Sequence, residues 1–126
     1  MTRKRKNGKG SKWIRPATRL AIYARDGFAC VVCARGAEDV SLTLDHVVAL
    51  DNGGTHAATN LVTMCLACNS RKQAKRVRSW FAYLRARDVN TSALAKRIKR
   101  RTSKPIDRAE GRRLFELRRA RREVHA

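Results

Sequence analysis

Four cysteines, arranged as two Cys-x-x-Cys pairs, constrain this 126-residue chain more than any other feature. The first pair is Cys30 and Cys33, the second is Cys65 and Cys68, and 31 residues separate the pairs. Each pair can bind one tetrahedral ion from a single turn, and two such turns complete a closed four-sulfur shell. We interpret the set as a structural zinc site. Redox cysteines or buried free thiols are the alternative, but one pair would suffice for redox chemistry and no βαβ pattern surrounds either.

A zinc ion held by four thiolates has no open position for a water molecule, so this zinc is expected to stabilise the fold and not to catalyse. Metal binding of this kind contributes directly to folding free energy. That contribution matters here because the compact part of the chain is expected to be small, and small domains need such a cross-link.

Charge is distributed unevenly along the chain. The sequence has 30 Lys and Arg against 10 Asp and Glu, for a formal net charge of +20. Residues 1–29 carry +8, residues 30–69 carry −3 and residues 70–126 carry +15. Charge of this size and sign opposes compaction and attracts polyanions, so DNA or RNA is the expected partner and an acidic membrane surface is the weaker alternative.

Nothing in the sequence predicts a membrane span or a secretory leader. No uncharged apolar run approaches the roughly 18 residues that a span needs. The start of the chain, MTRKRKNGKGSKW, lacks the apolar stretch of a signal peptide. We therefore expect no membrane partner and a cytoplasmic location, where cysteines stay reduced and are available to metals.

The centre of the chain predicts one helix and two strands. A short helix is expected within residues 15–30, with Pro16 in its first turn and Gly27 at its end. The β-branched runs VSLTLDHVVAL and LVTMC are separated by a polar loop over residues 51–60 that contains Asn-Gly-Gly. This pattern is typical of two antiparallel strands.

The rest of the chain predicts helices. Apolar residues at helical spacing indicate a helix from about Leu66 to about Asp88, and a second is expected over residues 92–101. A third should begin at Asp107, which forms a capping box with Glu110. The fold class is therefore α+β.

We expect the chain to divide into three regions. Residues 1–12 are Lys, Arg, Gly, Asn and Ser with almost nothing to bury, which predicts a disordered basic arm. Residues 13–88 should form the compact domain with the zinc site, and residues 89–126 a basic helical extension.

The stretch LDHVVALDNGG, residues 44–54, contains the pair Asp45 and His46 inside an otherwise apolar run. Burying a carboxylate and an imidazole is costly unless each has a partner. The polar residues that follow at Asn60 and Asn69 are candidate members of the same site.

The segment LTLDHVVALDNGGTHAATNLVTMCLACNSRK, residues 42–72, resembles the HNH endonuclease family. That family has a ββα-metal motif with an Asp-His pair on the first strand, a Gly-Gly loop, Asn-Leu opening the second strand, and Cys-x-x-Cys leading into a helix. The preceding RLAIYARDGFACVVC is similar to the usual lead-in to the first zinc knuckle. The resemblance implies a small ββα-metal core, cross-linked by the four-cysteine zinc site and flanked by basic helices.

The resemblance also implies roles for four residues. His46 would be the general base that deprotonates a water molecule, since an imidazole with a pKa near about 6.5 can be neutral at cellular pH. Asp45 and Asn69 would hold a catalytic divalent metal, and Asn60 would tie the loop to the strand and orient His46. Asp45 and His46 are both expected to address one phosphate, so the first strand should end or distort near His46.

This sequence departs from the commonest family pattern at Asn69, where a third histidine is frequent. The chain resembles the His-Asn-Asn version of the motif. A carboxylate together with an amide oxygen is an oxygen-rich donor set, which suits Mg²⁺ or Mn²⁺ better than a histidine-containing site would.

Several basic residues follow the second knuckle and are expected to contact DNA: Arg71, Lys72, Lys75 and Arg76. A solvated helical face is the alternative for each of them. His56 lies in the polar loop away from the motif positions and is interpreted as solvated.

Two classes of function remain. The first is a metal-dependent DNA endonuclease that hydrolyses phosphodiester bonds of double-stranded DNA, holding mainly the phosphate backbone. One metal site cuts one strand, so a monomer should nick and a double-strand break needs a dimer or two encounters. Small nucleases of this type resemble those of phage and mobile elements, acting in a bacterial or phage-infected cell. The alternative is a non-catalytic zinc-knuckle protein that binds DNA or RNA, which would not need Asp45 beside His46.

Overall fold

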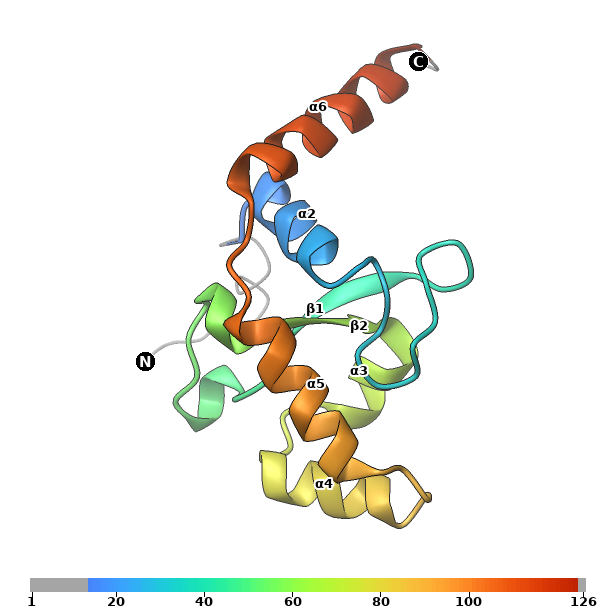
Figure 1. Ribbon diagram of the computed structural model, residues 1–126, viewed down its shortest axis with the longest axis vertical. Helices are drawn as coiled ribbons and strands as arrows, with labels where there is room; N and C mark the ends of the chain where they lie inside the picture. Colours follow the sequence, from blue (N-terminus) through green and yellow to red (C-terminus); the bar gives the residue numbers. More distant parts are fainter. Residues whose placement is uncertain (1–13, 125–126) are drawn as a thin grey trace.

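The computed structural model of the protein describes residues 14–124. Within this range a two-stranded antiparallel sheet is surrounded by five helices, so the α+β class is confirmed (Figure 1). The expected basic arm over residues 1–12 lies outside the described residues. None of the helices between residues 14 and 124 is long and apolar enough to cross a membrane.

The sheet consists of β1 (Leu42–His46) and β2 (Leu61–Cys65), and its register pairs Leu42 with Cys65 and His46 with Leu61. Both strands lie in the runs predicted from sequence, and β1 ends at His46 as expected. Every residue of β2 is buried. Successive side chains of a strand point to opposite faces, so β2 contributes to a core on each side of the sheet.

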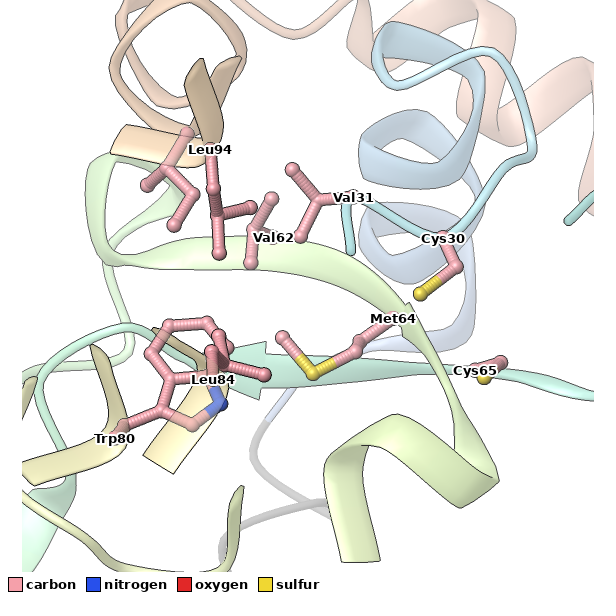
Figure 2. Packing of buried hydrophobic residues seen from close by; sticks show 9 residues of the cluster. Cys30, Val31, Val62, Met64, Cys65, Trp80, Leu84 and Leu94 are labelled. Carbon is pink, nitrogen blue, oxygen red and sulfur yellow. The ribbon is translucent and has the colours of Figure 1, made fainter. Parts of the chain in front are cut away.

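The larger core lies on the face that α4 (Val77–Arg85) and α5 (Thr91–Ser103) cover. Val62 and Met64 of β2 pack there against Trp80 and Leu84 of α4 and against α5 (Figure 2). The members of this cluster are Cys30, Val31, Val62, Met64, Cys65, Trp80, Leu84, Leu94 and Ile98.

The opposite face of the sheet is covered by α2 (Pro16–Arg25). Ile22 of α2 packs on Leu44 and Leu61 in a second, smaller cluster. Helix α6 (Arg108–Val124) packs its first turns against α2, and the rest of α6 extends away from the molecule to the C-terminus (Figure 1).

A buried ion pair joins α2 to β2. The Arg25 guanidinium contacts the Asp26 carboxylate at 2.7 Å and donates to the Leu61 carbonyl, also at 2.7 Å. Asp26 in turn accepts the backbone N–H of Thr63 at 2.9 Å. These bonds satisfy backbone groups on the side of β2 that β1 does not pair, which would otherwise be buried without partners. No local pattern in the sequence indicated this network.

The structure has two helices where the sequence predicts one. The helical pattern from Leu66 to about Asp88 divides into α3 (Leu66–Lys72) and α4, because Gln73 has a positive φ of 51° that ends α3. The two helices bury different side chains: Lys72 of α3 points at β1, whereas Trp80 of α4 packs in the larger core. The intervening Gln-Ala-Lys-Arg contains no helix breaker, so the sequence carried no signal of the turn.

The larger core extends beyond residue 88, where the compact domain was expected to end and a helical extension to begin. Leu94 and Ile98 of α5 are buried in the cluster around Met64. Arg97 and Arg101 donate to the backbone carbonyls of Val31 and Ala29 at 3.1 and 2.7 Å. Helix α5 is therefore part of the compact unit, because its apolar face and two of its arginines close over the first knuckle.

Candidate active site

The four cysteines converge. Their sulfur atoms all lie within 4.8 Å of one another, and the Sγ atoms of Cys33 and Cys65 are 3.8 Å apart. Sulfur atoms on a tetrahedral zinc with Zn–S bonds of about 2.3 Å are separated by roughly 3.8 Å. The cluster therefore has the dimensions of a four-sulfur zinc site, which the spacing of the cysteines predicted.

Backbone N–H groups point at the sulfur atoms of both knuckles. Cys30 Sγ accepts from the N–H of Val32 at 3.4 Å, and Cys65 Sγ accepts from the N–H of Cys68 at 3.4 Å. Burial and the neighbouring thiols Cys30 and Cys33 raise the pKa of Cys68. Negative charges on four adjacent sulfur atoms repel one another, and a cation bound between them removes this repulsion, which fits a structural zinc.

Asp45 lies one residue before the end of β1, opposite Val62 in the ladder, and is only 6% exposed. Its Oδ2 atom is 3.1 Å from Lys72 Nζ, in an ion pair, but accepts no hydrogen bond from the described residues. Burial raises the pKa of Asp45 to about 6, and the nearby Lys72 opposes that rise. The carboxylate is thus ionised at pH 7 and keeps a lone pair for another cation.

Lys72 is fully buried, and the expected DNA contact at this position does not fit the structure. Its ammonium donates to the His46 carbonyl at 3.1 Å and lies 5.1 Å from the centre of the Trp80 ring. A side chain with no exposed surface cannot reach a phosphate. Lys72 instead neutralises Asp45, since a buried carboxylate without a partner would be costly.

His46 lies beside a second histidine. Its Nε2 is 3.1 Å from Nδ1 of His56, and the two rings meet edge to face at 5.1 Å. Burial lowers the pKa of His46 below its ordinary 6.5, and His56 and Lys72 lower it further. The His46 imidazole is therefore neutral at pH 7. The interpretation of His56 as a solvated loop residue was wrong: the loop returns it to the end of β1.

Asn60 holds the loop between the strands. Its Oδ1 accepts the N–H of Val48 at 2.9 Å, and its Nδ2 donates to the carbonyls of Val48 and Thr55 at 3.0 and 2.9 Å. Gly54 packs against the same point, where a Cβ would collide with the Val48 carbonyl. Because all three bonds go to loop backbone, Asn60 fixes the path that carries the chain from His46 to His56.

One part of the chain is similar to a known protein family. Residues 30–80 match the HNH endonuclease family, over about two fifths of the chain. Residues 30–80 are therefore similar to this family and are called the HNH segment below. No curated protein and no solved structure matches it. The HNH segment includes both knuckles, both strands, α3 and the first turn of α4.

Asn69 lies on α3 of the HNH segment, one turn before Lys72 on the same face, and is half-buried. Its side chain makes no hydrogen bond to the described residues, so its amide oxygen is available as a ligand. One carboxylate, one amide oxygen and solvent or phosphate oxygens form a donor set that Mg²⁺ accepts. Asp45 Oδ2, which accepts no hydrogen bond from the described residues, fits such an ion, and Lys72 already supplies one positive charge there.

The other basic residues expected to contact DNA lie at the surface of the HNH segment. Arg71 and Arg76 are exposed, and Lys75 is half-buried beside the Tyr83 ring, 5.2 Å from its centre. Lys75 also donates to the Arg71 carbonyl at 2.7 Å. All three remain available to a polyanion, in contrast to Lys72.

Proposed function

We propose that the HNH segment is the catalytic centre of a divalent-metal-dependent endonuclease that hydrolyses phosphodiester bonds in DNA. The observation that carries the proposal is the neutral, half-buried His46 at the end of β1, directly after an ionised and largely buried Asp45. A protein that only binds nucleic acid has no need of a base and a buried carboxylate on consecutive residues of a strand. The family of the segment supports a nuclease, and the charge of the chain supports a polyanionic substrate.

His46 is proposed to remove the proton from the attacking water molecule. If its Nε2–H donates to Nδ1 of His56, its own Nδ1 keeps the lone pair that accepts the proton. The imidazolium then formed donates more strongly to His56, which stabilises the charge. His56 is thus proposed to hold the tautomer and the ring orientation of His46, and Asn60 to hold the loop that places His56.

Asp45 and Asn69 are the residues that would hold Mg²⁺ or Mn²⁺. When bound, the ion stabilises negative charge on the phosphate and on the leaving oxygen. The four cysteines are proposed to hold zinc for structural purposes only, since they leave no site for a water molecule.

Double-stranded DNA is the proposed substrate, held mainly through its backbone. The expectation that one HNH segment nicks one strand, and the expected origin in phage or mobile elements, stay predictions. So does the expected dimer for double-strand breaks.

Incubation of the zinc-loaded protein with supercoiled plasmid tests the proposal. Nicked circles should accumulate with Mg²⁺ or Mn²⁺ and not without added metal. His46→Ala should slow cleavage by about 10²-fold or more, because general-base catalysis contributes roughly 10² to 10⁴. The same variant should keep its zinc and its affinity for DNA. Cleavage by His46→Ala at the wild-type rate would refute the proposal, and so would a zinc-loaded protein that binds DNA but never cuts it.

A further inference from the structure

A cavity of about 520 Å³ opens between the first turns of α2 and α6 and the loop that carries His56. Arg15 and Thr18 line it from the start of α2, and Arg108 and Arg112 line it from the start of α6. The two sets of residues are far apart in sequence, and none of the residues that line the cavity is acidic. The cavity therefore combines three guanidinium groups, and all three come from residues outside the matched HNH segment.

The guanidinium groups of this cavity are unpaired within residues 14–124. Elsewhere on α6, Arg113 contacts Glu110 at 2.7 Å and Arg119 contacts Glu116 at 3.4 Å. In the same range no such pair involves the side chains of Arg15, Arg108 or Arg112. Cations gathered in a hollow without counter-charges repel one another and gain most from an anion such as a phosphate.

The packing of α6 fixes the shape of the cavity. Gly111 is buried against α2, and a Cβ at this position would collide with the Ala17 carbonyl oxygen and lie 2.8 Å from the Ala21 Cβ. Only glycine lets the two helices approach so closely. Arg108 and Arg112, on either side of Gly111, are thereby held at a defined distance from Arg15.

His56 connects the cavity to the proposed catalytic centre. It lines the cavity and is also 3.1 Å from His46. The ladder position of His46, opposite Leu61, places it on the face of the sheet that α2 covers. The cavity therefore lies next to the side chain that contacts the proposed base, and so close to the position proposed for the scissile phosphate.

We propose that Arg15, Arg108 and Arg112 form a binding site for a backbone phosphate of the substrate strand, close to the phosphate that is cut. The inference rests on the proposed endonuclease function and assigns part of α6 to the substrate path. The site holds the strand by charge-assisted hydrogen bonds and reads no base, because phosphate contacts position the strand without specifying sequence.

Two double variants with the same change in charge test the site. Arg108→Ala with Arg112→Ala removes two of its cations, and Arg118→Ala with Arg122→Ala removes two exposed arginines at the same spacing on the distal part of α6. Affinity for a short duplex, measured without Mg²⁺, should fall about tenfold or more in the first variant, since two guanidinium donors to the phosphate are removed. The control should weaken binding less than about threefold. Equal effects would show that only net charge matters and would overturn the proposal.

The phosphate that the three arginines bind can be located with duplexes in which one backbone phosphate is replaced by a neutral methylphosphonate. In the wild type, one substitution near the cut should weaken binding, and Arg108→Ala with Arg112→Ala should abolish that sensitivity. Gly111→Val gives a second test that keeps every arginine: it should separate α6 from α2 and reproduce the loss of affinity. If affinity and methylphosphonate sensitivity stay at wild-type levels in Gly111→Val, the proposal fails. Because these measurements use binding, they stand even if the wild type proves unable to cut DNA.

Discussion

At the scale of single residues, the site contains charged side chains whose burial costs free energy unless each has a partner. The buried charged residues among those described form two pairs, Arg25 with Asp26 and Lys72 with Asp45. Each pair also bonds to the backbone of a strand, Arg25 to Leu61 and Lys72 to His46. Removing one partner from such a pair typically costs about 3 to 5 kcal/mol, because the other charge is left uncompensated. These residues therefore hold the end of β1 and the start of β2 in place.

The contact between His46 and His56 leads to a prediction about the proposed base. His56→Ala removes the acceptor for Nε2 of His46, so kcat should fall about tenfold or more while KM for DNA changes little, as expected when an interaction serves mainly the transition state. His56→Asn places an amide oxygen near the position of Nδ1 and should restore much of the rate. Single-turnover cleavage of a labelled duplex would measure both. If His56→Ala cuts normally while His46→Ala does not, His56 has no positioning role, and the endonuclease proposal is unaffected.

At the scale of elements, the zinc knuckles would cross-link two parts of the chain that lie far apart in sequence. Cys30 and Cys33 follow α2, whereas Cys65 ends β2 and caps α3, where its side chain accepts the N–H of Cys68. A two-stranded sheet is not stable alone in water and needs packing or a cross-link. Zinc would supply that cross-link, and the orientation of α3 relative to β1 would follow from it.

Cys33→Ser should therefore destabilise the fold far more than its exposed position suggests. Cys33 is the exposed cysteine of the four, so its replacement creates no cavity in the core, and the effect should come from the incomplete metal shell. Zinc content should fall well below one equivalent and the melting temperature should drop strongly. Adding zinc after chelation should restore the wild type and not the variant. A Cys33→Ser protein with native stability and no bound zinc would contradict the structural role.

At the scale of the whole molecule, the basic C-terminal region has two parts with different roles. Helix α5 belongs to the core through Leu94 and Ile98, whereas α6 contacts α2 by its first turns and then projects outward (Figure 1). Leu117 in the projecting part is 50% exposed, and arginines surround it. This part of α6 therefore contributes little to folding and presents positive charge to a polyanion.

Two truncations should separate these roles. Ending the chain after Lys104 removes α6 and should leave the zinc content unchanged. Binding to unrelated duplexes should weaken. The slope of log affinity against log salt concentration should flatten by about 0.9 for each phosphate that the protein no longer neutralises. Ending it after Asp88 also removes α5 and exposes the core around Met64, so cooperative unfolding should disappear. Denaturant unfolding and a salt series on two duplexes would measure these effects. A stable protein ending at Asp88, or an unchanged salt slope after removal of α6, would contradict this division.

The sequence by itself determined the features whose residues lie close together in the chain. Each Cys-x-x-Cys pair and each strand run lies within a short segment, and its chemistry or periodicity follows from neighbours in the chain. The four-sulfur cluster, the two strands and the end of β1 at His46 were therefore predicted, as was the Asp107 side chain that accepts the N–H of Glu110. The roles expected for Asp45, His46, Asn60 and Asn69 came from the resemblance to a family and stay predictions.

Only the tertiary structure decided which distant groups meet. Thirty basic residues were equally plausible surface cations, and local sequence does not show that Lys72 is the one buried against Asp45. Three other features also depend on the tertiary fold: the contact of His56 with His46, the turn at Gln73 and the packing of α5 into the core. The reason is physical: the cost of burying a charge is set by the partner that the fold brings to it, and that partner can lie anywhere in the sequence.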